Sequence, residues 1–506
     1  MKSCTIFCAT LLCLTLPGCE MSPNKNITKV ENGLRYQILI SGEKDPYMSL
    51  TNRMKYHKVP AVSIVVIDEG KLAWAKGYGH ISFDTNAQKV DTKTLFQAGS
   101  ISKPVTAIGA LVLVEQGKLA LDANVNDYLK SWKIPDNEFT KKEKVTLRRL
   151  LSHTAGTSVH GFPGYSVGTP IPTIIEILEG KKPQANTDPV RVIQTPGKEV
   201  KYSGGGTTIV QLLIEDVTGE KFDVWMKKNV LVPFGMLAST FSQPLTQDYA
   251  NHAAYGHNQD GKPVSGKWHI YPEMAAAGLW TTPTDLANFL ITVLNISQGR
   301  KKGPISQALM QEALSSQMSC SPTDSACLGF FLSGMEKEKA LGHGGVDEGF
   351  IANMRVYPEL GKGWVIMTNG MGGGGLIPEI ECSIADSYAM PGLEATIKTP
   401  IQLDPTLLSK FVGIYKDPNA KQEHIITIRM LGDALSIVDS YTSITDERKL
   451  YPVKDDMFFA KEWPVTIQFL RSGNQIDRLM LIDKDGKPLL DEHKKEMVLK
   501  KVKNNN

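Results

Sequence analysis

The stretch FQAGSISKPVTA, residues 96–107, places Ser100 and Lys103 three positions apart where a long apolar run begins. The run continues to Gly117, a pattern that predicts a buried helix. Pro104 fits the first turn of such a helix, because its missing backbone N–H would have no partner there. Residues three apart share one face of a helix, so the Lys103 amine would lie beside the Ser100 hydroxyl, close to the positive helix N-terminus.

The same spacing also fits an ordinary helix cap, since Ser is a favoured N-cap residue. It recurs in SPNK, residues 22–25, and in SGEK, residues 41–44, where no apolar period follows. Whether Ser100 is a cap or a nucleophile therefore depends on the other motifs of the chain.

The composition excludes several classes of function. The chain has 506 residues, of which 42% are hydrophobic and 22% charged, an ordinary globular composition with room for two or more domains. A net charge of +3 with dispersed lysines argues against nucleic-acid binding.

The histidines and glycine runs do not form cofactor motifs. His252 and His257 lack the spacing of a helical zinc site, and the glycine runs 204–206 and 372–375 lack the lysine of a phosphate-binding loop. We therefore expect no metal and no cofactor.

The N-terminus predicts export. Residues 1–18 have one lysine followed by an apolar run, as in a signal peptide. Leu16-Pro17-Gly18-Cys19 resembles a bacterial lipobox, in which the cysteine carries the lipid, although Pro17 is unusual there and plain signal cleavage is the alternative. We expect a polar tether over residues 19–45 and a protein that is periplasmic and membrane-anchored as a lipoprotein, or else secreted. No other segment is apolar enough to cross a membrane.

Three further cysteines follow. Cys320 and Cys327, in CSPTDSAC, could close a short polar loop by a disulfide in an oxidising compartment. Cys382 is then predicted to be a buried structural thiol rather than a catalytic one.

Apolar runs at both ends of residues 46–390 predict one domain with an antiparallel sheet of about five strands flanked by helices. An all-α region from Ser100 to about Leu332 would be inserted between the early and late strands, which brings Ser100 and His343 to one cleft. This is an α+β fold. The predicted strands lie within residues 61–79, 340–346, 350–357 and 363–369.

The last hundred residues have a different pattern of apolar and polar residues. Residues 404–506 contain short alternating strands at roughly ten-residue spacing with Gly and Asp turns. This pattern predicts a small β-barrel or sandwich domain, joined by a linker over residues 391–403.

Four motifs follow the opening stretch in order: LLSHTAG (150–156), KYSGGG (201–206), AAAGLWTTPTDLANF (275–289) and GHGGVDEGF (342–350). Together the five resemble the serine β-lactamase and penicillin-binding-protein superfamily, in its class C-like branch of β-lactamases, D,D-peptidases, D-aminopeptidases and esterases. The resemblance covers roughly residues 46–390. Each motif is weak singly, but their order and separation agree.

The resemblance implies a role for each matching residue. Ser100 matches the acylated nucleophile and Lys103 the amine that helps to deprotonate it. Tyr202 matches the tyrosine of a Tyr-x-Asn motif, which exchanges protons with the serine and the leaving group. The resemblance further implies a substrate-binding strand with His343, Gly344 and Gly345, and an oxyanion hole formed by the backbone N–H groups of Ser100 and Val346.

The chemistry agrees with these roles. A serine hydroxyl is a weak nucleophile, so it needs an adjacent base and donors aimed at the developing oxyanion. A lysine acts as a base only when its pKa is lowered, and a phenol only when cations lower its own pKa. We expect Lys103 and Tyr202 to provide these surroundings for each other. His153 in LLSHTAG suggests a Ser-His-Asp triad, but in the superfamily that loop is structural.

Two departures from the pattern bear on the substrate. Gly204 replaces the asparagine of Tyr-x-Asn, and His343, largely neutral near pH 7, replaces the lysine of Lys-Thr-Gly. We predict an exported serine hydrolase that forms an acyl-Ser100 intermediate with small-molecule esters or peptides containing D-amino acids. The alternatives are a class C-like β-lactamase and a non-catalytic, surface-tethered binding protein that retains the fold. The oligomeric state stays open.

Overall fold

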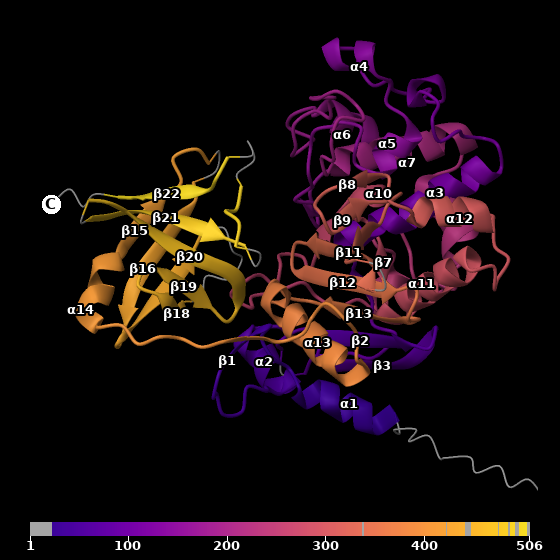
Figure 1. Ribbon diagram of the computed structural model, residues 1–506. Helices are drawn as coiled ribbons and strands as arrows, with labels where there is room; N and C mark the ends of the chain where they lie inside the picture. The colour runs from indigo at the N-terminus through magenta and orange to yellow at the C-terminus, as the bar shows by residue number, and fades with distance from the viewer. Residues whose placement is uncertain are drawn as a thin grey trace, which may run out of the picture.

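The computed structural model describes residues 23–502 except 85, 336–337, 421–422, 441–446, 474, 484–485 and 491–494. The predicted signal peptide and Cys19 lie outside the described residues. In this described part, no helix is long and apolar enough to cross a membrane. Figure 1 shows a large mixed α/β unit with a smaller barrel beside it.

One antiparallel sheet forms the centre of the large unit, with strand order β3-β2-β13-β12-β11-β10-β9-β8. The five long strands are β2 (Ala61–Asp68), β3 (Lys71–Gly79), β11 (Ala340–Asp347), β12 (Phe350–Tyr357) and β13 (Lys362–Thr368). They confirm the predicted α+β fold class. The short strands β8 (Met318–Ser319), β9 (Asp324–Ala326) and β10 (Phe331–Ser333) extend the sheet. The region predicted to be all-α is therefore not purely helical, and it also contains the paired strands β5 (Tyr165–Ser166) and β6 (His269–Ile270).

Helices cover both faces of this sheet, which explains why β2 is a nearly continuous apolar run. Val62, Ile64 and Val66 pack into a core shared with the N-terminal and C-terminal helices of the unit, whereas Val65 and Ile67 pack into the core of the helical region. The helices of the unit are α1 (Pro23–Asn32), α2 (Leu50–Tyr56), α3 (Ser102–Glu115), α4 (Glu138–Lys142), α5 (Leu147–Leu151), α6 (Ile174–Glu179), α7 (Gly204–Thr218), α8 (Phe222–Met226), α9 (Gln247–Ala250), α10 (Met274–Ala277), α11 (Pro283–Ser297), α12 (Gln307–Leu314) and α13 (Gly373–Tyr388).

Ser100 lies one turn before α3 rather than at its cap. Residues Gly99–Ile101 form a 3₁₀ turn, and α3 then runs from Ser102 to Glu115, with Gly117 in the left-handed region at φ 68°. Ser102 Oγ donates to the Gly99 carbonyl at 2.6 Å and accepts the Leu279 N–H at 3.0 Å. The turn is thereby fixed to the strand pair β4 (Phe96–Gln97) and β7 (Trp280–Thr281) that flanks it.

The prediction of a polar tether over residues 19–45 was wrong for its described part. Residues 23–32 form α1, and Val30 and Leu34 are fully buried in the core that α13 also lines. Arg35 is also buried and donates two 2.6 Å hydrogen bonds to the Asp386 carboxylate on α13. The exposed side of the segment is polar, and only a few of its residues supply apolar side chains to the core. This small number of apolar positions gave a weak signal in the sequence.

We predict that Leu34→Ala destabilises the large unit by about 2–5 kcal/mol, because a buried leucine is lost and a cavity remains. Urea unfolding followed by circular dichroism measures this change. Leu360→Ala, at a side chain that is 37% exposed, is the control and should shift the midpoint far less. Equal midpoints for the two variants would show that the N-terminal segment does not pack on the sheet.

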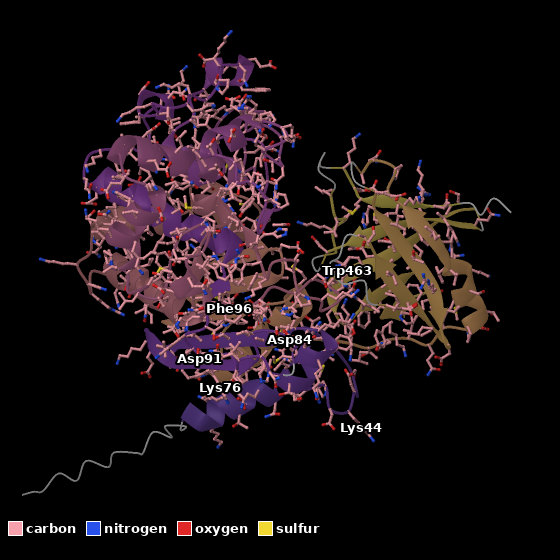
Figure 2. The ribbon with its side chains drawn as sticks, turned by 180° about the vertical axis from the view of Figure 1, so that it is seen from behind. Lys44, Lys76, Asp84, Asp91, Phe96 and Trp463 are labelled. Atoms are coloured by element: carbon pink, nitrogen blue, oxygen red, sulfur yellow. The ribbon has the colours of Figure 1, made fainter. Side chains whose placement is uncertain are left out.

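The C-terminal domain is a closed eight-stranded antiparallel barrel with its own apolar core. Its elements are α14 (Pro405–Leu408), β15 (Gly413–Lys416), β16 (Ile425–Leu431), β17 (Ala434–Asp439), β18 (Arg448–Lys454), β19 (Met457–Ala460), β20 (Trp463–Ser472), β21 (Gln475–Ile482) and β22 (Val498–Lys501). Within the predicted linker, β14 (Thr396–Lys398) pairs in parallel with β1 (Ile38–Ile40). Lys461 of the barrel forms an ion pair with Glu43, which joins the two units. Figure 2 labels Lys44, the residue after Glu43, and Trp463, two residues after Lys461.

The predicted disulfide does not form, because Cys320 and Cys327 are both free thiols. In the β8–β9 hairpin the N–H of Cys320 donates to the Asp324 carbonyl, so Asp324, not Cys327, lies opposite Cys320. Cys320 is exposed, whereas the Cys327 thiol is buried and donates to the Leu314 carbonyl at 3.4 Å. Cys382 is buried on α13, as predicted for a structural thiol.

Candidate active site

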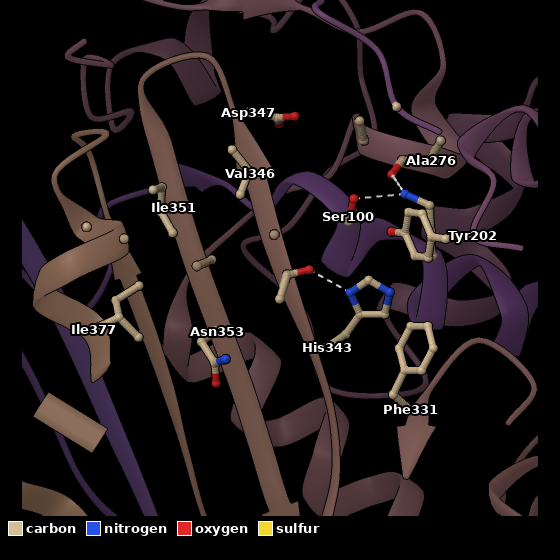
Figure 3. Close-up of a pocket in the computed structure, with 18 of the residues that line it drawn as sticks. Ser100, Tyr202, Ala276, Phe331, His343, Val346, Asp347, Ile351, Asn353 and Ile377 are labelled. Carbon is tan, nitrogen blue, oxygen red and sulfur yellow. Dashed lines mark hydrogen bonds between the residues drawn. The ribbon is translucent and has the colours of Figure 1, made fainter. Parts of the chain in front are cut away.

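A cleft of about 730 Å³ opens where the 3₁₀ turn, the N-terminus of α7 and the strand β11 meet. Figure 3 shows Ser100, Tyr202, His343 and Phe331 on one side of β11. Ser100, Lys103, Tyr202 and the stretch His343–Asp347, from distant parts of the chain, all line it. The structure therefore brings the predicted site residues together.

Lys103 points directly at the Ser100 hydroxyl. Its Nζ donates to Ser100 Oγ at 2.9 Å and to the Ala276 carbonyl at 2.8 Å (Figure 3). The side chain is buried, and this burial lowers the pKa of Lys103 to about 7. Ala276 belongs to the AAAGLW motif, so that motif positions the amine. An amine with this pKa can hold or accept a proton near neutral pH.

Tyr202 stands over the amine, with its ring centroid 5.0 Å from Lys103 Nζ. The expectation that cations would lower the pKa of this phenol was wrong. Burial raises the pKa of Tyr202 to about 12, and a hydrogen bond with Ser100 offsets only part of the increase. Tyr202 is thus a neutral phenol near pH 7, suited to donate a proton rather than to abstract one.

His153 holds the backbone on both sides of Tyr202. Its Nδ1 accepts the Ser203 N–H at 3.3 Å, and its carbonyl accepts the Lys201 N–H at 2.7 Å. Burial and the neighbouring Lys103 keep the pKa of His153 well below its usual value, so the ring is neutral. The geometry supports the structural interpretation of this histidine over a role as triad base.

A loop fills the space beside Gly204, where the Tyr-x-Asn motif would carry an asparagine side chain. The N–H of Gly204 donates to the His160 carbonyl at 3.0 Å. A Cβ at Gly204 would lie 3.0 Å from the Phe162 ring and 3.1 Å from that same carbonyl. An asparagine side chain there would require Phe162 or the His160 carbonyl to shift by a few tenths of an ångström, and in this chain Phe162 and His160 form this wall of the cleft.

Two glycines allow the main chain of the 3₁₀ turn that carries Ser100 to contact the main chain of β11. A Cβ at Gly345 would lie 1.9 Å from the Ala98 carbonyl oxygen and 3.3 Å from the Ser100 nitrogen. A Cβ at Gly99 would lie 2.5 Å from the Val346 nitrogen. These approaches bring the backbone nitrogen atoms of Ser100 and Val346, the predicted oxyanion donors, to the same place in the cleft.

His343 makes the neighbouring wall uncharged. Its Nδ1 lies 2.5 Å from the Gly344 carbonyl oxygen, and its ring lies 5.5 Å from that of Phe331. Burial and the nearby Lys103 lower the pKa of His343 to about 3, so it carries no charge near pH 7. Phe331, which has no recognisable signal in the sequence, completes an apolar surface where a class C β-lactamase would present a lysine.

Asp347 is a site residue that the sequence interpretation missed. Its side chain points to the same face of β11 as His343 and Gly345, and it is 3% exposed. Burial raises the pKa of Asp347 well above its usual value, and Lys103 opposes that rise. The alternation of His343, Gly345 and Asp347 in GHGGVDEGF was the available signal. Glu273, also fully buried, lies near Asp347, and burial raises its pKa to about 8.

No group of three or more His, Cys, Asp or Glu side chains in the described residues is arranged to hold a metal ion. The glycine run 372–375 lies at the start of α13, where Gly373 and Gly374 line the cleft.

Comparison with known proteins places this site in context. The family model described as Beta-lactamase matches residues 49–380. Protein flp of Staphylococcus aureus (strain N315) is 26% identical over 329 residues, which cover 62% of this chain and 60% of that protein. Penicillin-binding protein 4 of Amycolatopsis lactamdurans is 25% identical over 329 residues and is covered to 82%. The chain thus spans about 60% of the length of the Staphylococcus relatives.

Solved structures share the fold at lower identity. The octameric penicillin-binding protein homologue from Pyrococcus abyssi has a TM-score of 0.58 at 21% identity, covering 89% of this chain and 98% of that one. The D-alanine carboxypeptidase AmpC from Burkholderia cenocepacia has a TM-score of 0.52 at 20% identity, covering 67% of this chain and 96% of its own. At these identities the likeness concerns the fold alone.

Proposed function

Because the chain belongs to the β-lactamase family, we propose that it is a serine hydrolase that forms an acyl-Ser100 intermediate with esters or with peptides containing D-amino acids. The observation that carries the proposal is the 2.9 Å contact between Lys103 Nζ and Ser100 Oγ, together with the Lys103 pKa of about 7. A serine without such a base would be a poor nucleophile.

In this mechanism, neutral Lys103 accepts the hydroxyl proton as Ser100 Oγ forms a bond to the substrate carbonyl carbon. The backbone N–H groups of Ser100 and Val346 stabilise the oxyanion. Tyr202 donates its proton to the leaving oxygen or nitrogen as that bond breaks, and it recovers a proton from Lys103. Water then attacks the acyl-enzyme by the same route and releases the acid.

The electrostatics of the cleft favour substrates without a carboxylate beside the scissile bond. Among the described residues that line it, Lys103 is the only lysine or arginine, so the lining offers no second cation to a substrate carboxylate. The neutral His343 offers no fixed cation. A neutral ester should therefore bind better than a β-lactam or a peptide ending in a free carboxylate, both of which carry that charge.

Covalent labelling and a substrate panel test the proposal. A fluorophosphonate probe should add its mass to Ser100, and Ser100→Ala should abolish the addition. A short-chain aryl ester, nitrocefin and a D-Ala-D-Ala peptide should then be hydrolysed in that order of efficiency, each in a Ser100-dependent manner. Fast nitrocefin turnover would indicate a β-lactamase instead. No labelling and no turnover of any activated ester would indicate a binding protein.

The pH dependence of the ester reaction reports the base. We expect kcat/KM to rise with pH through about 7 and to level off above it, because only the neutral amine of Lys103 accepts the serine proton. His343, His153 and His160 have lowered pKa values, so their titration should lie at more acidic pH. A profile that stays flat from pH 5 to pH 9 would rule out Lys103 as the base.

Export remains part of this proposal and rests on residues 1–19 alone. The lipobox-like sequence before Cys19 supports a lipid anchor. Labelled palmitate should be incorporated into the full-length chain and not into Cys19→Ala. Equal incorporation into both would refute lipidation at this residue.

A further inference from the structure

The cleft does not end at Ser100 but continues over β11 onto the opposite face of the sheet. β10 pairs with β11 only as far as Gly342, so from His343 onward the outer edge of β11 has no strand partner among the described residues. Figure 3 shows Ile351, Asn353 and Ile377 on the side of β11 away from Tyr202 and His343. We call this part the rear groove; its lining residues are Gly344, Val346, Ile351, Asn353, Gly373, Gly374, Ile377, Pro378 and Glu381.

The rear groove has apolar walls and one carboxylate. Val346 is 57% exposed, although it is a valine on a strand beside the nucleophile. Glu381 is partly buried on α13 and accepts the Trp364 Nε1–H at 3.0 Å, and in the described part of the chain no cationic nitrogen lies within 4 Å of it. Burial raises the pKa of Glu381 to about 7, so the group is mainly a carboxylate, able to pair with a cation, only above that pH.

Arg355 is the nearest competitor for this carboxylate. It lies two positions beyond Asn353 on β12 and attracts Glu381 electrostatically. Its guanidinium, however, donates to Ser333 Oγ at 3.0 Å and lines a separate crevice toward the barrel. The Glu381 carboxylate therefore keeps room for a cation from the groove side.

We propose that the rear groove binds a distal part of the substrate that carries a primary amine or guanidinium, with Glu381 as the residue that selects it. This inference rests on the proposed acyl-Ser100 chemistry. Neighbouring strands lie about 4.8 Å apart and an extended peptide advances about 3.3 Å per residue, so crossing β11 and β12 requires about three residues. The substrate class is therefore a short peptide or depsipeptide with a basic side chain distal to the scissile bond.

Matched substrates test the selection at pH 8, above the pKa of Glu381. Three acetyl-D-alanyl depsipeptides, with the ester as scissile bond, carry Lys, norleucine or Glu three residues beyond it. Norleucine removes the charge while it keeps most of the apolar side chain. We expect kcat/KM for the Lys substrate to exceed that for norleucine about tenfold and that for Glu by more. Glu381→Gln, which can still accept the Trp364 N–H, should bring the Lys-to-norleucine ratio to about one.

Two further variants separate this inference from its alternatives. Glu359→Gln removes an equal charge at an exposed turn and should keep the ratio near ten. Gly344→Val adds a side chain into the groove, where a Cβ would meet nothing closer than 3.9 Å, and should slow the depsipeptides more than a short aryl ester. A ratio near one in the unmodified protein overturns the inference, while Ser100-dependent turnover of the aryl ester would leave the proposed function intact.

Discussion

Lys103→Met is expected to lower kcat/KM for a short aryl ester by about 10³, within the 10²–10⁴ range typical of general-base catalysis. Lys103 Nζ is the one side-chain amine in contact with Ser100 Oγ among the described residues, and it also contacts the Ala276 carbonyl. Methionine has a similar length and no proton-accepting nitrogen, so it removes the base and keeps the packing. The measurement is steady-state hydrolysis, with the concentration of active sites determined by the fluorophosphonate probe.

Folding of this variant is the necessary control. Burial opposes the charged form of Lys103, so an apolar replacement should leave the unfolding temperature unchanged or raise it. Lys103→Arg should be as inactive as Lys103→Met, since a guanidinium stays protonated at all accessible pH values. Retention of a tenth or more of the activity by the folded methionine variant would exclude Lys103 as the base.

Gly345→Ala is expected to lower kcat by about 10²–10³, comparable to the loss of one oxyanion donor. The added Cβ would lie 1.9 Å from the Ala98 carbonyl oxygen, so β11 and the turn that carries Ser100 must separate. The separation moves the Val346 N–H away from Ser100, and overpacking should cost about 1–3 kcal/mol of stability. Hydrolysis rates and urea unfolding measure the two effects.

The adjacent residue provides the comparison. Gly344 faces the open groove, where a Cβ would meet only the Ala352 carbonyl oxygen at 3.9 Å. Gly344→Ala should therefore change the unfolding midpoint much less than Gly345→Ala. If the two variants behaved alike, the close approach of β11 to the Ser100 turn would not be the cause of the loss.

Local patterns were sufficient to predict much of this fold. The five long strands and the helix after Ser100 follow from apolar runs and turn residues, and the ordered motifs identified Ser100, Lys103 and Tyr202 as neighbours. The strands β8 to β10 were missed because each has only two or three residues, too few to show an alternating pattern. Helix α1 was missed because it contributes few apolar residues to a core that α13 and β2 dominate.

Long-range contacts set the remaining properties of the site. The raised pKa of Tyr202 and the lowered pKa of His343 are caused mainly by burial, which depends on elements far away in the sequence. In the same way, Phe162 fills the space beside Gly204 because its loop bonds to the start of α7. The spacing of residues within the motifs gives no information about these long-range contacts.

If Cys19 carries the lipid proposed above, the ordered helix α1 would limit how far the protein can move from the membrane. With a lipid on Cys19, only residues 20–22 separate the anchor from α1, a reach of about 10 Å when fully extended. A tether of the length first expected would let the cleft sweep a wide volume of the periplasm. The short connection would instead hold the enzyme against the bilayer, so we expect its substrates to be found at the membrane surface.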